Sequence, residues 1–170
     1  MKIAVALFPG RFQPFHQGHL QILKEAAENF EDVIVLIGSA QYSRTEDNPF
    51  SLEERKEMIS RVLAAAKLDN VVIREKEDDH DDEVWVHNVI HRMPWFDTVY
   101  AGDNRLVAKL FSAEGKKVIE HDRFKGISAT EIRRRIESGA PWDDQVPPEV
   151  AEYLEEIDGD RIIKRTEEMD

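Results

Sequence analysis

The sequence predicts an α/β protein, with a single Rossmann-like, doubly wound parallel sheet of about five strands flanked by helices. Short apolar runs rich in β-branched residues recur along the chain, and patterns with helical periodicity lie between them. This alternation, with short connections, is typical of β-α-β crossovers in an open sheet. The 170 residues suit one domain, spanning 1–170, that can bury a sizeable core.

Five runs are expected to form the strands. Their apolar character is almost continuous, as in a parallel sheet that helices cover on both faces. The expected strands are residues 3–7, 32–38, 70–73, 97–102 and 116–120.

Helices are expected in the intervals between these strands. Ser51 and Glu54 match a capping box, in which each side chain accepts the backbone N–H of the other residue, and Ser128 and Glu131 match a second. Pro147-Pro148 should start the last helix. The expected helices are residues 18–29, 51–67, 83–92, 103–113 and 128–139, followed by a C-terminal helical segment at about 147–166.

Composition excludes several classes of protein. The formal net charge of −12 argues against a nucleic-acid partner. The absence of cysteine excludes disulfides and cysteine-ligated zinc, and it suits a reducing compartment. Pro9 and Arg11 interrupt the N-terminal apolar run, so we expect a strand there rather than a signal peptide. No run approaches the roughly 20 apolar residues of a membrane span. We therefore expect a soluble, cytoplasmic protein.

The stretch FPGRFQPFHQGHL, residues 8–20, lies between the first strand and the first helix. In an open α/β sheet this position presents a ligand to the free N–H groups and the positive dipole end of a helix. Arg11 offers a planar fork for phosphate oxygens, and His16 and His19 can each donate an N–H from one side of the helix start. These residues predict a site for an anion, such as a polyphosphate.

Two other interpretations of this stretch stay open. His16 and His19 can belong to a metal site, although zinc needs a third protein ligand, or the loop can be purely structural. A P-loop and a G-x-G-x-x-G fingerprint are both absent from the sequence. The acidic segment EKEDDHDDE, residues 75–83, is expected to be a solvated loop, with Mg²⁺ binding as the alternative.

Two motifs carry a resemblance to a known family. GRFQPFHQGH (10–19) resembles the G-x-F-x-P-x-H-x-G-H signature of the nucleotidyltransferases related to class I aminoacyl-tRNA synthetases, and ISATEIR (127–133) resembles their second signature. IGSAQYS (37–43), NPFSLEER (48–55) and VWVHNV (84–89) are most similar to archaeal-type nicotinamide mononucleotide adenylyltransferases. The resemblance covers nearly the whole chain.

The resemblance implies adenylyl transfer from ATP to nicotinamide mononucleotide, giving NAD and pyrophosphate, with Mg²⁺ carried by the ATP phosphates and no metal held by the protein alone. It implies catalytic roles for Arg11, His16, His19 and Arg133. The residues implied to bind ATP are Pro9, Gly10, Arg11, Phe12, Gln13, His16, Gly18, His19, Gly102, Asp103, Ser128, Thr130 and Arg133.

A second group is implied to bind the nicotinamide nucleotide. Trp85 would stack on the nicotinamide ring, with core packing among its apolar neighbours as the alternative. Asp82 stands where relatives carry asparagine, and Asp47 stands where some carry arginine, so Arg44 is our candidate substitute for that arginine. The implied residues are Ser39, Ala40, Gln41, Arg44, Asn48, Phe50, Asp82 and Trp85.

Two further functions remain alternatives at this point. The chain can transfer a nucleotidyl group to another phosphate ester, such as phosphopantetheine, glycerol phosphate or flavin mononucleotide, or it can be a nucleotide sensor without turnover. The resemblance also implies a homo-oligomer, with a hexamer as one candidate assembly, and no membrane partner.

Overall fold

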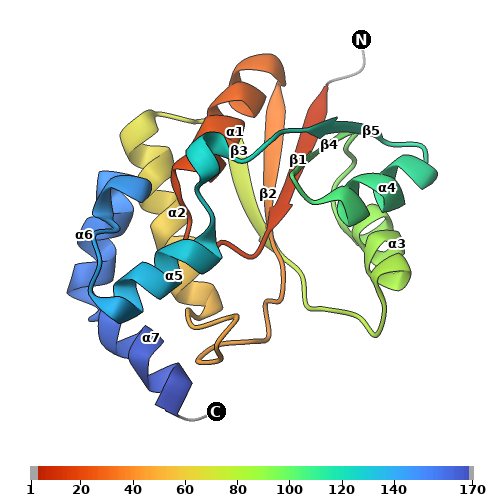
Figure 1. Cartoon of the computed structure of the whole chain (residues 1–170). Helices are drawn as coiled ribbons and strands as arrows, with labels where there is room; N and C mark the ends of the chain where they lie inside the picture. Colours follow the sequence, from red (N-terminus) through yellow and green to blue (C-terminus); the bar gives the residue numbers. More distant parts are fainter. Residues whose placement is uncertain (1–3, 169–170) are drawn as a thin grey trace.

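Five parallel strands form the central sheet, in the order β3-β2-β1-β4-β5 (Figure 1). This computed structural model describes residues 4–168. The strands are β1 (Val5–Gly10), β2 (Asp32–Ile37), β3 (Val71–Glu75), β4 (Thr98–Gly102) and β5 (Lys117–Glu120). The predicted parallel sheet of five strands is confirmed.

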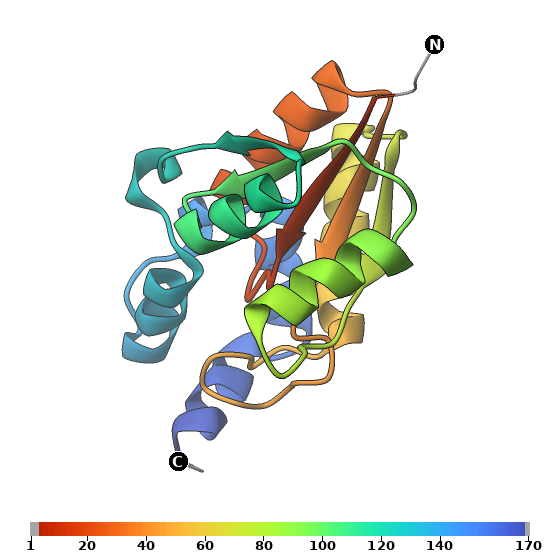
Figure 2. The same cartoon turned by 90° about the vertical axis from the view of Figure 1, so that its right-hand side faces the viewer.

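Helices cover both faces of the sheet, as Figures 1 and 2 show from two directions. On one face, α3 and α4 pack against an apolar cluster that contains Leu7 and Leu36. On the other, α1, α2, α5, α6 and α7 enclose a larger cluster around Phe8 and Val35. The helices are α1 (Gln17–Asn29), α2 (Leu52–Ala66), α3 (Asp82–Arg92), α4 (Arg105–Ala113), α5 (Ala129–Ser138), α6 (Pro148–Glu156) and α7 (Gly159–Glu168).

Strand β1 lies at the centre of the sheet, and its pairing determines where the sheet opens. It pairs with β2 along its whole length, from Val5 to Gly10, but with β4 only at Ala6 and Leu7. Chain crossovers run in opposite directions from the two sides of β1, and such a switch point leaves a crevice at the carboxyl ends of the strands. The carboxyl ends of β1 and β4 are therefore free to flank a ligand.

The structure differs from the expected elements in three places. Strand β1 continues through Pro9 and Gly10, which pair with β2 alone. The C-terminal segment is two helices, α6 and α7, because Asp158 between them adopts φ 53°. A Cβ at Gly159 would lie 3.1 Å from the Leu154 carbonyl oxygen, so the chain turns there at a residue without a side chain.

The third difference concerns the caps. Ser51 and Glu54 form the predicted capping box of α2. At α5, Ser128 Oγ accepts the Glu131 N–H at 3.2 Å, but the Glu131 carboxylate turns to Arg134 and Arg135. The second box is thus only half formed. Within residues 4–168, no helix is long and apolar enough to cross a membrane.

Candidate active site

Two adjoining cavities lie at the carboxyl ends of β1 and β4. One of about 630 Å³ contains His16 and His19 and is called here the histidine compartment. The other, of about 680 Å³, contains Trp85 and is called the tryptophan compartment. Both are within the size range of small-molecule sites. The two compartments share the residues Pro9, Gly10, Arg11, Ala101 and Asn104. They form one cleft with two ends, and Arg11 stands at the junction.

His16 and His19 are held in a reciprocal arrangement at the start of α1. His16 is the N-cap, and its Nδ1 accepts the N–H groups of Gly18 at 3.1 Å and His19 at 3.3 Å. The His16 N–H in turn donates to His19 Nδ1 at 3.1 Å. Because both Nδ1 atoms are acceptors, the proton of each neutral ring belongs on Nε2. Each imidazole therefore has an Nε2–H group free to donate to a ligand.

Burial keeps both rings neutral. It lowers the pKa of His16 to about 4; the negative charge of Asp103 raises this pKa by a smaller amount, and the positive charge of Arg123 lowers it slightly further. The pKa of His19 is well below its usual value, first because of burial and second because of the neighbouring His16. The rings of Phe12 and Phe15 flank His19 with centroids 4.8 and 5.3 Å away. The histidine compartment thus offers neutral hydrogen-bond donors at physiological pH.

Gly18 leaves the space that the His16 ring needs for capping α1. A Cβ at this position would lie 3.0 Å from His16 Cε1. Any side chain would push the imidazole away from the helix start, which explains why glycine stands between the two histidines.

Arg133 approaches the same compartment from the far end of the chain. Its Nη1 donates to the Gln13 carbonyl at 2.8 Å, and its Nη2 lies 4.0 Å from Asp47 Oδ1. Burial and then the positive charge of Arg11 lower the pKa of Arg133. Arg11 and Arg133 thus place two mutually repelling guanidinium groups in one compartment beside the neutral N–H donors, and an anion bound between them would relieve that repulsion.

The N-terminus of α5 completes the histidine compartment. Ser128 and Thr130 line it, and the first turn of the helix contributes free N–H groups. Of the three consecutive arginines, only the first is largely enclosed, with side chains exposed by 11% at Arg133, 74% at Arg134 and 38% at Arg135. The three neighbours diverge around the helix because consecutive positions are about 100° apart.

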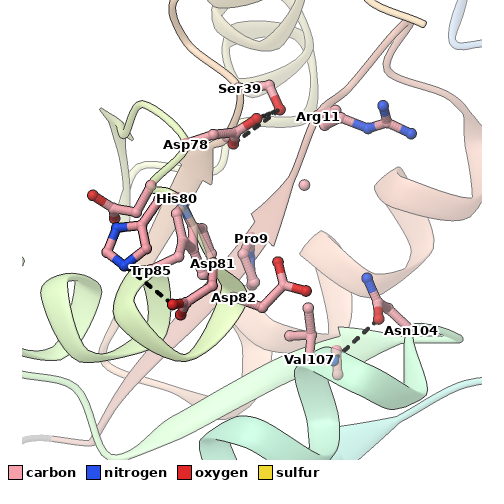
Figure 3. Close-up of a pocket in the computed structure, with 14 residues that line it drawn as sticks. Pro9, Arg11, Ser39, Asp78, His80, Asp81, Asp82, Trp85, Asn104 and Val107 are labelled. Atoms are coloured by element: carbon pink, nitrogen blue, oxygen red, sulfur yellow. Dashed lines mark hydrogen bonds and ion pairs between the residues drawn. The ribbon is translucent and has the colours of Figure 1, made fainter.

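The tryptophan compartment lies between α3 and α4 (Figure 3). Trp85 packs edge-on against Phe111, with centroids 6.2 Å apart, and its indole Nε1 is buried without a hydrogen-bond partner. The Ser39 hydroxyl donates to the Asp78 carboxylate at 2.9 Å. Asp82 also lines this compartment. Its walls therefore combine an aromatic ring with acidic acceptors.

Residues 78–82 of the acidic segment line this compartment, so the segment is more than a solvated loop. Buried Lys76 donates to the Glu77 carbonyl at 2.7 Å and to Asp79 Oδ2 at 2.6 Å. Asp81 caps α3 by accepting the Val84 N–H at 2.8 Å. Among the described residues, no group of three or more histidines or carboxylates is placed to hold a metal ion.

Comparison with known proteins places this cleft in a family. The cytidylyltransferase-like family model matches residues 7–135, which run from within β1 through β5 to most of α5. A nicotinamide-nucleotide adenylyltransferase of Thermococcus kodakarensis is 43% identical over 162 residues, covering 93% of this chain and 86% of that protein. The chain belongs to the nicotinamide-nucleotide adenylyltransferase family.

Other members and neighbours agree with this assignment. The adenylyltransferase of Methanococcus vannielii is 41% identical over 167 residues, covering 97% of this chain and 96% of that protein. A crystal structure of a bifunctional NMN adenylyltransferase/ADP ribose pyrophosphatase from Francisella tularensis, complexed with AMP and a manganese ion, superposes with a TM-score of 0.79 at 27% identity. The match covers 97% of this chain and 52% of that one, so this chain spans about half the length of the bifunctional protein.

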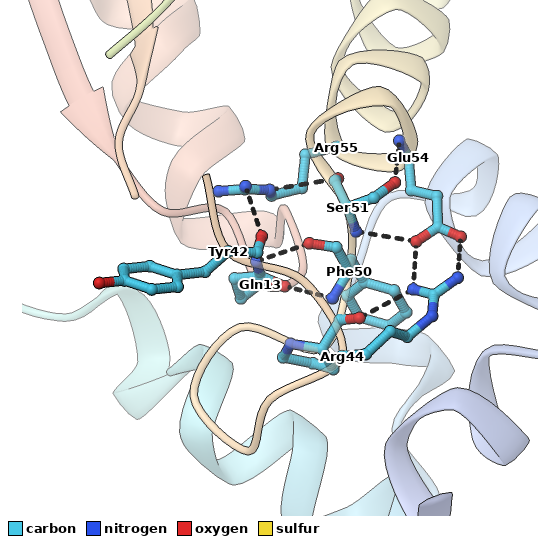
Figure 4. A network of polar contacts seen from close by, with 8 residues as sticks. Gln13, Tyr42, Arg44, Phe50, Ser51, Glu54 and Arg55 are labelled. Atoms are coloured by element: carbon cyan, nitrogen blue, oxygen red, sulfur yellow. Dashed lines mark hydrogen bonds and ion pairs between the residues drawn. The ribbon is translucent and has the colours of Figure 1, made fainter. Parts of the chain in front are cut away.

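All the residues expected to bind ATP in this adenylyltransferase line the histidine compartment. Their parts differ. Gln13 is buried, and its amide is fully engaged: Nε2 donates to the Phe50 carbonyl and Oε1 accepts the Phe50 N–H, both at 2.9 Å (Figure 4). Phe12 is buried beneath Gly10, where a Cβ would lie 2.9 Å from its ring. Gln13 and Phe12 therefore support the loop.

The residues expected to bind the nicotinamide nucleotide divide into two groups. Ser39, Asp82 and Trp85 line the tryptophan compartment. The others do not line it; they are Ala40, Gln41, Arg44, Asn48 and Phe50. The Phe50 side chain is fully buried in the core, so a direct ligand contact does not fit its position.

Arg44 is turned away from the cleft. Its Nη1 donates to Glu54 Oε1 at 2.5 Å and to the Pro49 carbonyl at 2.8 Å, and its Nη2 donates to Glu54 Oε2 at 3.0 Å (Figure 4). The bond to Glu54 raises the pKa of Arg44. The geometry does not favour the expectation that Arg44 replaces a phosphate-binding arginine, because its Nη atoms already donate to Glu54 on α2 and to the Pro49 carbonyl just before it.

Sequence reasoning missed Arg55, which is fully buried beneath the cleft of the adenylyltransferase. The sequence does contain a pattern that could have identified this residue. Arg55 lies on the same apolar stripe of α2 as Met58, Ile59 and Val62, where a charged residue is unexpected.

Proposed function

We propose that this chain transfers the adenylyl group of ATP to nicotinamide mononucleotide, forming NAD and pyrophosphate. One observation carries the proposal: His16 and His19 from the β1–α1 region and Arg133 from α5 meet in one compartment. That compartment joins an aromatic second compartment at Arg11. Such a cleft suits the meeting of a triphosphate with a second phosphorylated nucleotide.

In this reaction a phosphate oxygen of the mononucleotide attacks the α-phosphorus of ATP. The new P–O bond forms as the bond between the α-phosphorus and the bridging oxygen breaks, and both electrons of that bond leave with pyrophosphate. The chain forms no covalent bond in this scheme. Its contribution is to position two anions and to stabilise the charge that develops on the phosphate oxygens.

The histidine compartment suits the ATP side. The Nε2–H groups of His16 and His19 would donate to phosphate oxygens near the reacting phosphorus. As neutral donors they are ready across the physiological pH range. Arg133 and the N-terminus of α5 would bind the departing pyrophosphate portion, with Ser128 and Thr130 beside it. Arg11, which lines both compartments, would reduce the repulsion between the two phosphates.

The divalent cation enters as part of the substrate. The described residues hold no group of three or more carboxylates or histidines suited to a resident ion. Mg²⁺ usually keeps waters and binds through phosphates. We therefore take MgATP as the donor substrate, and the manganese ion in the related Francisella crystal structure supports divalent-metal use.

The tryptophan compartment suits the acceptor. The Trp85 indole would stack on the cationic nicotinamide ring, an interaction of roughly 0.5–2 kcal/mol. The carboxylates of Asp78 and Asp82 are acceptors that suit ribose hydroxyls or a carboxamide NH₂ group. A cationic, hydroxyl-rich ligand is favoured by such walls.

The test is pyrophosphate release from MgATP with a panel of acceptors. Nicotinamide mononucleotide should support rapid release, while flavin mononucleotide, phosphopantetheine and glycerol phosphate should not. Turnover with one of the latter three alone would replace the proposed acceptor. ATP binding by calorimetry without turnover on any acceptor would identify a nucleotide sensor instead.

The proposal includes a cytoplasmic homo-oligomer, with a hexamer as the candidate assembly. Family resemblance is its support. Light scattering coupled to size-exclusion chromatography measures the mass, and a monomer of 19.7 kDa would contradict it.

A further inference from the structure

Arg55 on α2 is a buried cation whose partners are all backbone carbonyls. Its side chain is fully enclosed, and no carboxylate of the described residues forms a salt bridge with it. It donates to the carbonyls of Arg11 at 3.1 Å, Gly38 at 2.8 Å and Ser39 at 3.2 Å. It also donates to the carbonyls of Ser51 at 3.3 Å and Tyr42 at 3.4 Å (Figure 4). One guanidinium thus joins five chain positions.

Three of these five carbonyls belong to residues that line the cleft. Arg11 follows β1 and lines both compartments, whereas Gly38 and Ser39 follow β2 and line the tryptophan compartment. A direct backbone bond also joins the two strand ends, because the Gly38 N–H donates to the Gly10 carbonyl at 2.8 Å. The Arg55 guanidinium adds a second link between the two strand ends through its hydrogen bonds to the Arg11, Gly38 and Ser39 carbonyls. We call this set of hydrogen bonds the brace.

Only arginine has the donors for this task. Its planar guanidinium presents five N–H groups in a fixed fork, whereas lysine has a single ammonium on a flexible stem. The arrangement is also costly, since a buried charge without a paired carboxylate is unfavourable and an apolar residue would continue the stripe of α2. Burial, and then the nearby Arg11, lower the pKa of Arg55 to about 10, so it stays charged at neutral pH.

We infer that Arg55 is a positioning residue that sets the separation between the ATP-binding and acceptor-binding compartments and touches neither substrate. This inference rests on the adenylyl transfer proposed above. In-line transfer between two bound nucleotides depends on their relative placement, and a displacement of about 1 Å can reduce the rate by about 10²-fold. Loss of the brace should therefore affect the reaction more than the binding of either substrate alone.

The test compares Arg55→Lys with the wild type. The variant keeps the charge and loses the fork. We expect kcat per active site to fall by about 10²-fold, while the dissociation constants of MgATP alone and of nicotinamide mononucleotide alone change by less than about threefold. Active sites are counted from the calorimetric stoichiometry of MgATP binding.

Met58→Ala is the matched control, because Met58 is fully buried on the same helix and lines neither compartment. It should lower the melting temperature and leave kcat per active site unchanged. Wild-type kcat in Arg55→Lys would overturn the inference. So would a fall in MgATP affinity as large as the fall in kcat, because Arg55 would then support ATP binding itself.

A measurement on the unaltered chain covers the case in which the variant does not fold. The guanidinium protons of Arg55 should give separate, slowly exchanging NMR resonances, which persist when MgATP and nicotinamide mononucleotide are added. Averaging of these resonances in the free protein would overturn the inference. Absence of wild-type turnover would instead refute the proposed function, and the resonances would still report on the brace.

Discussion

His16 and His19 stack with ring centroids 3.6 Å apart, and the Nδ1 atom of each ring accepts the backbone N–H of the other residue. The side chains that cap the helix are therefore the same pair that we propose as ligand-binding donors. The cap consumes both Nδ1 acceptors, and in doing so it directs both Nε2–H groups outward. The tautomer that suits a phosphate ligand follows from helix capping.

His19→Ala should reduce kcat/KM by about 10²–10³, the usual effect of removing one well-aimed donor from a developing oxyanion. Alanine also removes the acceptor for the His16 N–H, so His19→Asn is the sharper variant. Its short amide oxygen can still accept that N–H, but the side chain does not reach the position of Nε2. Both variants should lose activity, and the asparagine variant should unfold at a higher temperature than the alanine variant. Near-normal pyrophosphate release by His19→Asn would remove His19 from the mechanism.

The free energy of unfolding should decrease as the pH falls below the usual pKa of histidine, because His16 and His19 are buried as neutral rings. The folded pKa of His16, about 4, lies below its usual 6.5, so the unfolded chain binds the proton first as the pH decreases. The stability due to the neutral ring is complete above pH 6.5 and is lost progressively as the pH falls toward 4. His16 alone should contribute about 2 kcal/mol to the difference in unfolding free energy between pH 7.5 and pH 5.

Urea denaturation at the two pH values measures this difference. The double variant His16→Asn/His19→Asn serves as the control, because it keeps all carboxylates and removes only the two buried imidazoles. Its unfolding free energy should depend less on pH over this interval. Equal pH dependence in the wild type and the double variant would show that the histidines do not carry the effect.

Trp85→Ala should raise the KM for nicotinamide mononucleotide by about 2- to 30-fold, which corresponds to the loss of roughly 0.5–2 kcal/mol of stacking. The KM for MgATP should stay close to the wild-type value, since Trp85 lines only the tryptophan compartment. Trp95→Ala is the control, because that side chain is on the surface. Equal effects of the Trp85 variant on both substrates would favour a role in core packing alone.

Arg44→Ala should leave the KM for nicotinamide mononucleotide within about threefold of the wild type, as expected for a surface change. Its bidentate pair with Glu54 is partly exposed, so the loss of stability should be about 1 kcal/mol or less. Arg133→Ala is the matched comparison. It should lower kcat/KM for MgATP by roughly 10- to 150-fold, because a charge-assisted hydrogen bond is worth about 1.5–3 kcal/mol. A large loss of mononucleotide affinity in Arg44→Ala would restore the phosphate-binding role for that residue.

Local signals predicted most of the secondary structure, because strand burial, helical periodicity and caps depend on neighbouring residues. The capping box of Ser51 and Glu54 is an example. The failures occurred where another local interaction competed with the expected one. The Glu131 carboxylate pairs with two arginines instead of closing its box, and Asp158 divides the last helical segment at a left-handed turn.

The residues of the cleft also divide into those that the sequence predicted and those that it did not. Sequence motifs by themselves determined the chemistry that we propose for the histidine compartment, since the candidate phosphate donors lie in two short segments with recognisable spacing. Only the tertiary structure decided which of the remaining candidates line the cleft, because that depends on side-chain direction: Arg44 turns to Glu54, whereas Arg133 turns inward. It alone also revealed Arg55, whose carbonyl partners include Arg11, 44 residues earlier in the chain. Such contacts arise when the ends of β1 and β2 are brought together above α2, and no local pattern encodes them.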